Sequence, residues 1–202
     1  MRTVRTALLG AFTLALCLTA TGCGGGGHPK PPRAAEPTSL AQLHPDRMRV
    51  VRVAFCDLVP RRAVRAALAA APTRTSSWHN GDPVAAAGGE LGHEFGCSWS
   101  GPHGRLARAW VFARPVSPAF ARTLVRAADR DPGCTARAGT RFGHPSLVQS
   151  CVRSGAPRRT RLAGLFGDTW LSCEVAGHGP ATALRQRADA WCVSVADALD
   201  AG

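Results

Sequence analysis

The sequence contains no tyrosine, and among its 25 Lys and Arg residues only Lys30 is a lysine. Alanine and arginine are abundant instead, which is the bias that a very GC-rich genome produces. The formal net charge of +12 therefore does not require a polyanionic ligand to explain it. The arginines are mostly scattered, and no basic segment is interleaved with aromatic residues as a stacking platform for nucleic acid. We expect no nucleic-acid partner.

The sequence also lacks the motifs of common catalytic sites. His93-Glu94 is followed by Cys97 at the position where a zinc-protease helix needs its second histidine. No Cys-x-x-Cys pair or Cys/His cluster has zinc spacing, and no serine lies in a G-x-S-x-G turn. Beyond the N-terminal segment, no glycine run has the form of a phosphate loop. We predict no catalytic residue, no metal site, no cofactor and no enzymatic activity.

Two groups of residues are the basis for an alternative hypothesis, that the protein is an enzyme. His79, His93 and His103 could approach one another around a predicted hairpin, although each also suits an exposed loop. Asp168 and Glu174 flank a second hairpin, either as a carboxylate pair or as a turn residue and a solvent-facing residue. The alternative function is an envelope hydrolase that uses histidine and acidic residues.

No apolar run is long enough to span a membrane, which takes roughly 20 apolar residues. The longest run, Ala7–Thr19, follows two arginines and suits the hydrophobic region of a signal peptide. Ala20-Thr21-Gly22-Cys23 then resembles the lipobox of bacterial lipoproteins, where cleavage precedes a cysteine that receives a diacylglyceryl group. We predict a signal peptide over 1–22 and lipidation, including palmitate, at Cys23. Cleavage without lipidation, which leaves a soluble secreted protein, is the alternative.

Glycine and proline dominate the stretch after Cys23. Gly24–Gly27 and the proline-rich segment up to Pro45 have the composition of a linker and not of a packed core. We predict a flexible tether over 23–45 and one folded domain over 46–202. Lipidation would hold this domain at the extracellular face of the cell membrane, so the membrane is its first expected partner.

The eight cysteines divide between these regions. Cys17 leaves with the signal peptide, Cys23 is the lipid acceptor, and six remain in the domain. An even number of cysteines in an exported domain indicates disulfides. Six cysteines can pair in fifteen ways, and we favour pairing in order along the chain: Cys56–Cys97, Cys134–Cys151 and Cys173–Cys192.

Hydrophobic periodicity predicts three helices, which begin near Asp57, at Ser117-Pro118 and at Ala181. The predicted strands are Phe95–Trp99, Leu106–Ala113, Ser146–Val152, Arg161–Phe166 and Thr169–Val175. Residues 73–92 are polar and rich in turn-forming residues, which predicts a long loop. Because hairpins dominate this order, we expect a single α+β domain, with an antiparallel sheet built from hairpins, helices packed on it and disulfides bracing it.

The five tryptophans fall into two groups. Trp99, Trp110 and Trp170 lie on predicted strands and Trp191 lies on the apolar stripe of the last helix, so we assign all four to the core. Trp78 lies in the predicted polar loop, where an isolated aromatic residue is a possible contact residue for a partner. The alternative is that Trp78 folds back on the core.

Cys56-Asp57-Leu58, a short alanine-rich helix and then Cys97-Ser98-Trp99 on a strand resemble the actinobacterial secreted lipoproteins catalogued as domain of unknown function 3558. The lipobox-like start and the Gly/Pro tether match as well. The resemblance implies a lipid-anchored, disulfide-bonded α+β domain without catalytic residues. We expect a non-enzymatic lipoprotein of the cell envelope that binds a small molecule between sheet and helix, a wall component or a partner protein. A structural part of a surface complex is a further alternative.

Overall fold

The computed structural model describes residues 39–84 and 90–202. The predicted signal peptide, Cys23 and most of the predicted tether lie outside the described residues. Within them the chain forms α1 (Arg61–Leu68), α2 (Pro118–Ala128), α3 (Ala181–Leu199) and the short 3-10 helix η2 (Pro102–Gly104). None of these helices is both long enough and apolar enough to cross a membrane.

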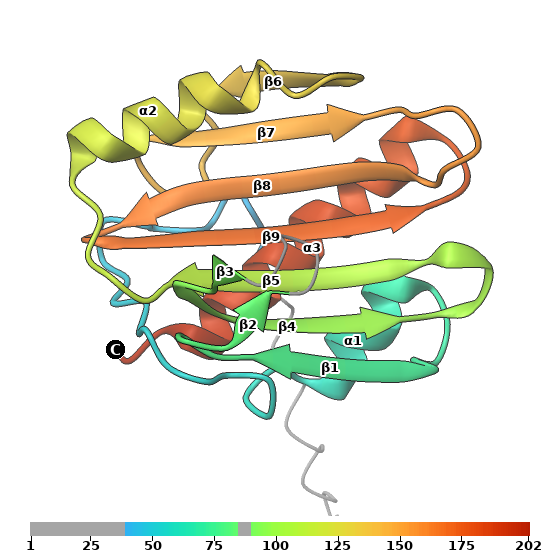
Figure 1. Cartoon of the computed structure of the whole chain (residues 1–202), viewed down its shortest axis with the longest axis horizontal. Helices are drawn as coiled ribbons and strands as arrows, with labels where there is room; N and C mark the ends of the chain where they lie inside the picture. Colours follow the sequence, from blue (N-terminus) through green and yellow to red (C-terminus); the bar gives the residue numbers. More distant parts are fainter. Residues whose placement is uncertain (1–38, 85–89) are drawn as a thin grey trace, which may run out of the picture. The chain divides into compact units, whose positions relative to one another are not determined.

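Seven strands form one antiparallel sheet (Figure 1). Their spatial order is β1 (Arg74–Trp78), β4 (Glu94–Ser100), β5 (Leu106–Phe112), β9 (Thr169–Gly177), β8 (Arg158–Phe166), β7 (Ser146–Cys151) and β6 (Cys134–Ala138). A separate two-stranded hairpin joins β2 (Pro83–Val84) to β3 (Glu90–Leu91). The prediction of a single α+β domain with an antiparallel sheet and packed helices is confirmed.

The two edge strands of the sheet were not predicted. Residues 73–92 were expected to form a loop, but they contain β1, β2 and β3; β6 was also missed at the opposite edge. In β1 every residue except Trp78 is exposed, and in β6 most residues are exposed. An exposed strand carries no alternation of apolar residues. Its conformation depends on hydrogen bonds to its neighbour, and these do not show in the sequence.

The helices largely begin where the sequence indicated. Ser117 caps α2, because its Oγ accepts a hydrogen bond from the backbone N–H of Phe120 at 3.2 Å. The first helix is shorter than predicted: it begins at Arg61, after Pro60 rather than at Asp57, and ends at Leu68. Ala69 follows in the left-handed conformation, with φ of 48°, and this ends the helix.

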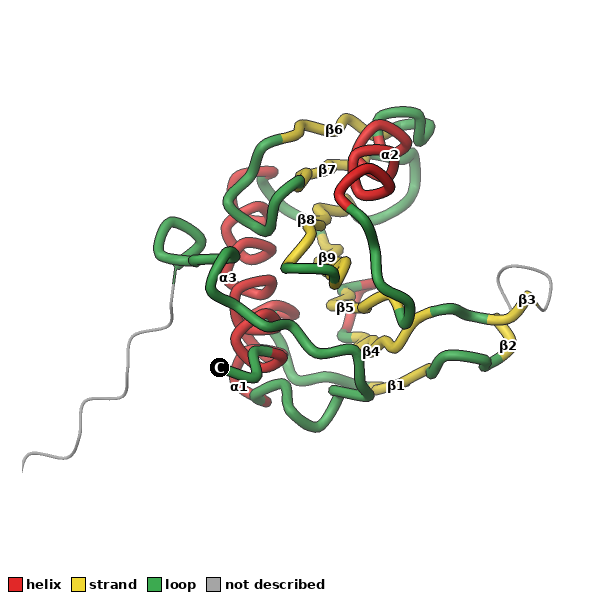
Figure 2. The backbone as a smooth tube through the Cα atoms, turned by 90° about the vertical axis from the view of Figure 1, so that its left-hand side faces the viewer, coloured by secondary structure: helices red, strands yellow, loops and turns green. Residues whose placement is uncertain are grey.

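The helices cover the two faces of the sheet unequally (Figure 2). We call the side on which α1 and α3 pack the closed face, and the side on which α2 packs over β6, β7 and β8 the open face. Because side chains alternate along a strand, Cys97 and Trp99 of β4 point to the closed face, whereas Gly96 and Ser98 point to the open face. The same strands therefore supply both surfaces.

The closed face contains the larger apolar core. The side chain of Trp191 on α3 is 1% exposed, and its ring meets that of Trp99 edge to face, with 5.3 Å between centroids. Its indole Nε1 donates a hydrogen bond to the carbonyl of Arg108 at 2.9 Å, so the polar atom of this buried ring is satisfied. The prediction that Trp99, Trp110, Trp170 and Trp191 are buried is confirmed.

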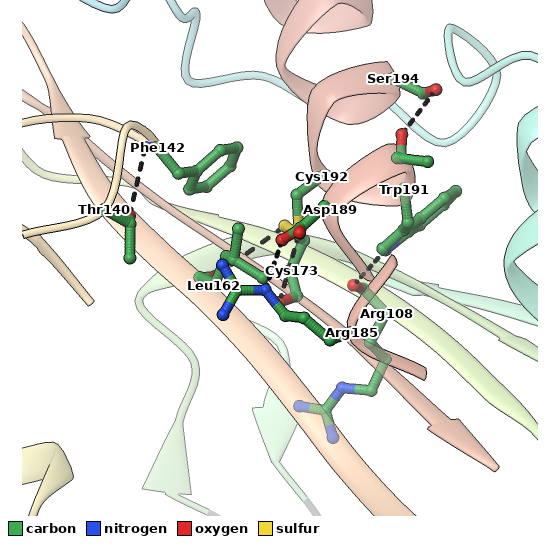
Figure 3. The surroundings of a disulfide bond; sticks show 11 residues. Arg108, Thr140, Phe142, Leu162, Cys173, Arg185, Asp189, Trp191, Cys192 and Ser194 are labelled. Atoms are coloured by element: carbon green, nitrogen blue, oxygen red, sulfur yellow. Dashed lines mark hydrogen bonds and ion pairs between the residues drawn. A yellow bond between two sulfur atoms is a disulfide. The ribbon is translucent and has the colours of Figure 1, made fainter. Parts of the chain in front are cut away.

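Three disulfides brace the domain, with the predicted sequential pairing. Cys56–Cys97 ties the segment before α1 to β4, and Cys134–Cys151 joins β6 to β7. Cys173–Cys192 connects β9 to α3 through the core of the closed face (Figure 3). This last bond fixes the longest helix to the centre of the sheet.

Candidate functional site

A cleft of about 220 Å³ lies between α2 and the open face of the sheet. Its aromatic walls are Trp110, Phe112 and Trp170, and α2 contributes Leu124 and Ala127. Three polar residues, Ser172, Arg161 and Asp131, also line it. We call this cavity the α2 cleft.

The hollow follows from residue sizes in one cross-strand row of the sheet. Trp110 on β5 pairs with Ser172 on β9, Ser172 pairs with Ala163 on β8, and Ala163 pairs with Leu147 on β7. The two central residues are small and the two outer residues are large. Because α2 lies above this row, the small side chains leave space that the larger ones enclose. Ser172 faces the cleft, whereas the neighbouring Cys173 faces the core on the other side of the sheet.

The next row on the same face is polar. It contains Arg108, Glu174, Arg161 and Gln149, each paired with the next across β5, β9, β8 and β7. Gln149 Nε2 donates to the carbonyl of Ala128 at 2.7 Å and to Asp131 Oδ2 at 2.8 Å. These two hydrogen bonds hold the C-terminal end of α2 against the sheet and so fix the width of the α2 cleft.

Arg161 is the cationic residue that lines the α2 cleft. Burial lowers the pKa of its guanidinium, and the negative charges of Glu174 and Asp131 partly offset this effect. Arginine nevertheless remains protonated in proteins. Its Nε is shielded from solvent and donates to no acceptor among the described residues. The cleft therefore contains a cationic donor whose hydrogen-bonding capacity is not used up by the fold.

Arg108 lies one step further along the polar row and organises the wall of the cleft. Its guanidinium stacks over the rings of Trp110 and Trp78, at 5.0 and 5.5 Å from their centroids. The Nε of Arg108 is also buried without an acceptor among the described residues. Glu174, between Arg108 and Arg161 in the row, is 5% exposed, and one of its carboxylate oxygens is 3.9 Å from Arg159 Nη1.

Trp78 lies on β1 and not in the predicted loop. Its ring covers Gly96 of β4 so closely that a Cβ at Gly96 would overlap it. Its Nε1 donates to Glu94 Oε1 at 2.8 Å. Trp78 therefore lies against the open face of the sheet and is half-buried, but it is not among the residues of either apolar core. Its role as a contact residue stays a prediction.

A second cavity of about 480 Å³ shares Phe112 with the α2 cleft. Its lining includes His93, Glu94, Val116 and Phe120, and the last of these is 50% exposed. We call it the outer cleft. Burial raises the pKa of the Glu94 carboxyl, while the hydrogen bond from Trp78 and the charge of Arg108 oppose the rise.

The three histidines proposed to gather do not all meet. His93 precedes β4 and His103 follows it on η2, so they lie at opposite ends of that strand. His79 lies beside Phe95, and its Nδ1 is 3.3 Å from Asp82 Oδ2. In the part of the chain that the structure describes, no group of three or more His, Cys, Asp or Glu residues is placed to hold a metal ion.

The two acidic residues of the second hairpin, Asp168 and Glu174, have different surroundings. Asp168 is 60% exposed at the β8–β9 turn and pairs with Arg52 Nη1 at 2.6 Å. Glu174 is buried in the polar cross-strand row, so the alternative in which it faces solvent is wrong. Arg159 on β8 lies 3.9 Å from the Glu174 carboxylate and compensates its charge.

Sequence reasoning missed Arg161 and Ser172 as site residues. The available signal was the place of Arg161 at the start of the apolar run RLAGLF on a central strand, where a charged residue needs a reason. No protein-family model matches the chain, and no curated protein matches it at a significant level. The function of the site therefore has to be inferred from the chemistry of the two clefts.

Proposed function

We propose that this chain is a lipid-anchored protein of the bacterial cell envelope whose domain binds a small, mainly apolar molecule in the α2 cleft, without catalysing a reaction. The observation that carries this proposal is the convergence of Trp110, Phe112 and Trp170 on one hollow between a helix and a sheet. Ligand sites are typically concave, apolar and lined by few polar groups, and this cleft has that composition.

The sizes of the two clefts favour a small or a narrow ligand. Drug-sized ligands occupy pockets of about 300–1,000 Å³, whereas the α2 cleft measures about 220 Å³. The outer cleft, of about 480 Å³, lies on the other side of Phe112 and offers room for a longer molecule. The half-exposed ring of Phe120 would contact such an extension.

The ionisable groups of the clefts support binding rather than proton transfer. Glu94 accepts a hydrogen bond from Trp78, and Asp131 accepts one from Gln149. Both carboxylates therefore hold parts of the fold in place. A general acid or base needs access to a substrate proton within hydrogen-bond reach, and these contacts compete with that role.

A variant that fills the α2 cleft tests ligand binding. Ala127 is exposed on α2 and lines the cleft, so Ala127→Leu should block it without disturbing the core. Ala119→Leu, on an exposed position of α2 outside the lining, is the matched control. With the neutral probe 1-naphthaleneacetamide in titration calorimetry, we expect the Ala127→Leu variant to bind at least about tenfold more weakly, and the control to bind like wild type. Equal binding by all three proteins, or no binding by wild type, would contradict the proposal.

The membrane anchor is tested separately. The lipobox-like segment before Cys23 supports the anchor, and the three disulfides support export to an oxidising compartment. In cells fed a labelled fatty acid, Cys23→Ala should abolish labelling and release the protein from the membrane. Cys17→Ala changes a cysteine inside the predicted signal peptide and should leave labelling intact. Continued labelling of the Cys23→Ala protein would place the anchor elsewhere.

A further inference from the structure

The α2 cleft is chemically asymmetric. Aromatic rings form its walls, but the row of residues at its polar side contributes the guanidinium of Arg161. The Nε–H of that guanidinium is buried and has no acceptor among the described residues. Leaving a buried donor unpaired is costly, and a buried polar group without a partner in a native structure calls for an explanation.

From this asymmetry we infer that the ligand carries a single carboxylate, which Arg161 binds, on an apolar body that contacts Trp110 and Trp170. The inference rests on the proposed function and names the chemical class of its ligand. A carboxylate accepts two parallel hydrogen bonds from a guanidinium, which are shorter and stronger than bonds between neutral groups. Ligand binding would thus give the guanidinium of Arg161, which lines the cleft, a charged hydrogen-bond acceptor.

The neighbouring acidic residues do not take this place. Asp131 Oδ2 accepts its hydrogen bond from Gln149, and Asp131 is exposed at the rim of the cleft. Glu174 lies beside Arg161 in the row, and the ion pair found for its carboxylate is with Arg159. Both carboxylates lower the cost of burying the charge of Arg161, yet neither accepts a hydrogen bond from its Nε.

The same geometry favours a monoanion over a phosphate or a polyanion. Arg161 is the one cationic side chain among the described residues that line the α2 cleft. A second negative charge on the ligand would lie close to the carboxylate of Asp131 and be repelled by it. The walls of Trp110 and Trp170 would then contact an aromatic or aliphatic body, which gains from leaving water.

Two probes that differ in charge alone test this inference. 1-Naphthaleneacetate and 1-naphthaleneacetamide share the ring and the linker, and only the first is an anion. Titration calorimetry should show that wild type binds the acetate about tenfold more tightly than the amide. Arg161→Gln should remove this preference and keep binding of the amide. Arg158→Gln removes the same charge from the opposite face of β8, and it should keep the preference.

Each outcome separates the two proposals. Equal affinity of wild type for both probes, or an unchanged preference in the Arg161→Gln protein, would overturn the carboxylate inference and leave apolar binding in place. Failure of wild type to bind either probe would overturn the proposed function as well. Arg161→Lys keeps a cation but lacks the planar fork. If circular dichroism shows that the glutamine variant does not fold, the lysine variant takes its place. It should still bind the acetate more tightly than the amide, but by a smaller factor than wild type. A preference equal to that of wild type would refute the inference.

Discussion

The two faces of the sheet are built from the same strands, yet they differ in almost every physical property. On the closed face, side chains such as Cys97, Ala109 and Leu171 are fully buried under α1 and α3. On the open face, the intervening residues include Arg108 and Arg161, and two clefts lie along α2. The closed face carries the larger apolar core, whereas the open face combines a smaller apolar core under α2 with charged residues and cavities.

The lengths of the helices account for much of this difference. α3 runs from Ala181 to Leu199 and contacts β5, β8 and β9, whereas α2 runs from Pro118 to Ala128 and contacts β6, β7 and β8. The shorter helix covers one side of the open face and leaves Trp78 and Arg108 at the uncovered side. Substitutions in the large core of the closed face should therefore cost the most stability, while those at the clefts of the open face should change binding first.

Trp191→Ala should have the largest effect, because it empties the centre of the closed face. Removal of a buried tryptophan typically costs about 3–5 kcal/mol, and here the hydrogen bond to Arg108 is lost as well. Urea unfolding followed by circular dichroism measures the change. Phe120→Ala, at the half-exposed position on the open face, should change the free energy of unfolding by less than about 1 kcal/mol. If the two variants lose similar amounts of unfolding free energy, the two faces do not differ in their contribution to stability.

Loss of the disulfide on the closed face should have the second-largest effect on stability. The Cys173→Ala/Cys192→Ala double variant opens a connection with a sequence separation of 19, worth about 3 kcal/mol in the chain-entropy model. The Cys134→Ala/Cys151→Ala control opens one of 17 at the edge of the sheet, so the entropy loss is nearly equal. Because Cys173 and Cys192 are fully buried and Cys134 is not, the first variant should unfold at lower urea. The reverse order would contradict our account of the core.

Gly96→Ala should have an intermediate effect on the open face. A Cβ at this position would overlap the ring of Trp78, so the ring has to move away from Arg108. Overpacking of this kind costs about 1–3 kcal/mol, and the tryptophan fluorescence spectrum should shift. Ser98→Ala, the next open-face position on β4, should change stability by less than about 0.5 kcal/mol. An unshifted spectrum for Gly96→Ala would show that Trp78 does not lie over the glycine.

The smallest expected effect is electrostatic and depends on pH. Because burial raises the pKa of Glu94, the folded state binds this proton more tightly than the unfolded state, and the ionised carboxylate costs stability at neutral pH. Glu94→Gln should therefore stabilise the domain at pH 7, and the gain should shrink as the pH falls through the raised pKa towards the ordinary value of glutamate. Unfolding curves over this pH range measure the gain.

Asp168 provides a control of opposite sign. The hydrogen bond from Arg52 lowers the pKa of Asp168, so its contribution to stability is present at neutral pH and is lost as the pH falls through the lowered pKa. Asp168→Asn should destabilise the domain slightly at pH 7 and have no effect at strongly acidic pH. If the change in the free energy of unfolding has the same sign and the same pH dependence for Glu94→Gln and Asp168→Asn, the opposite pKa shifts given to these two residues are wrong.

Much of the fold could be predicted from local patterns. The alternation of Phe95, Cys97 and Trp99 predicted β4, and the stripe that includes Leu184, Trp191 and Leu199 predicted α3, because burial on one face leaves a period in the sequence. The six cysteines predicted the disulfides, since an even count in an exported domain has few other uses. The edge strands β1 and β6 escaped prediction because they bury little and carry no such period.

The site depended on contacts between segments that are distant in the sequence. Trp110, Arg161 and Trp170 come from three strands, and Ala127 comes from a helix; they meet only because β9 lies between β5 and β8 and α2 crosses above. Composition and periodicity determined the helices, the central strands, the disulfide cysteines and the α+β class, because residues close along the chain, or a count of one residue type, suffice for each of these. Cross-strand register, the burial of Arg161 and the hollow above Ser172 were decided by the packing of the whole domain, because a cavity belongs to the space between elements and not to any one of them.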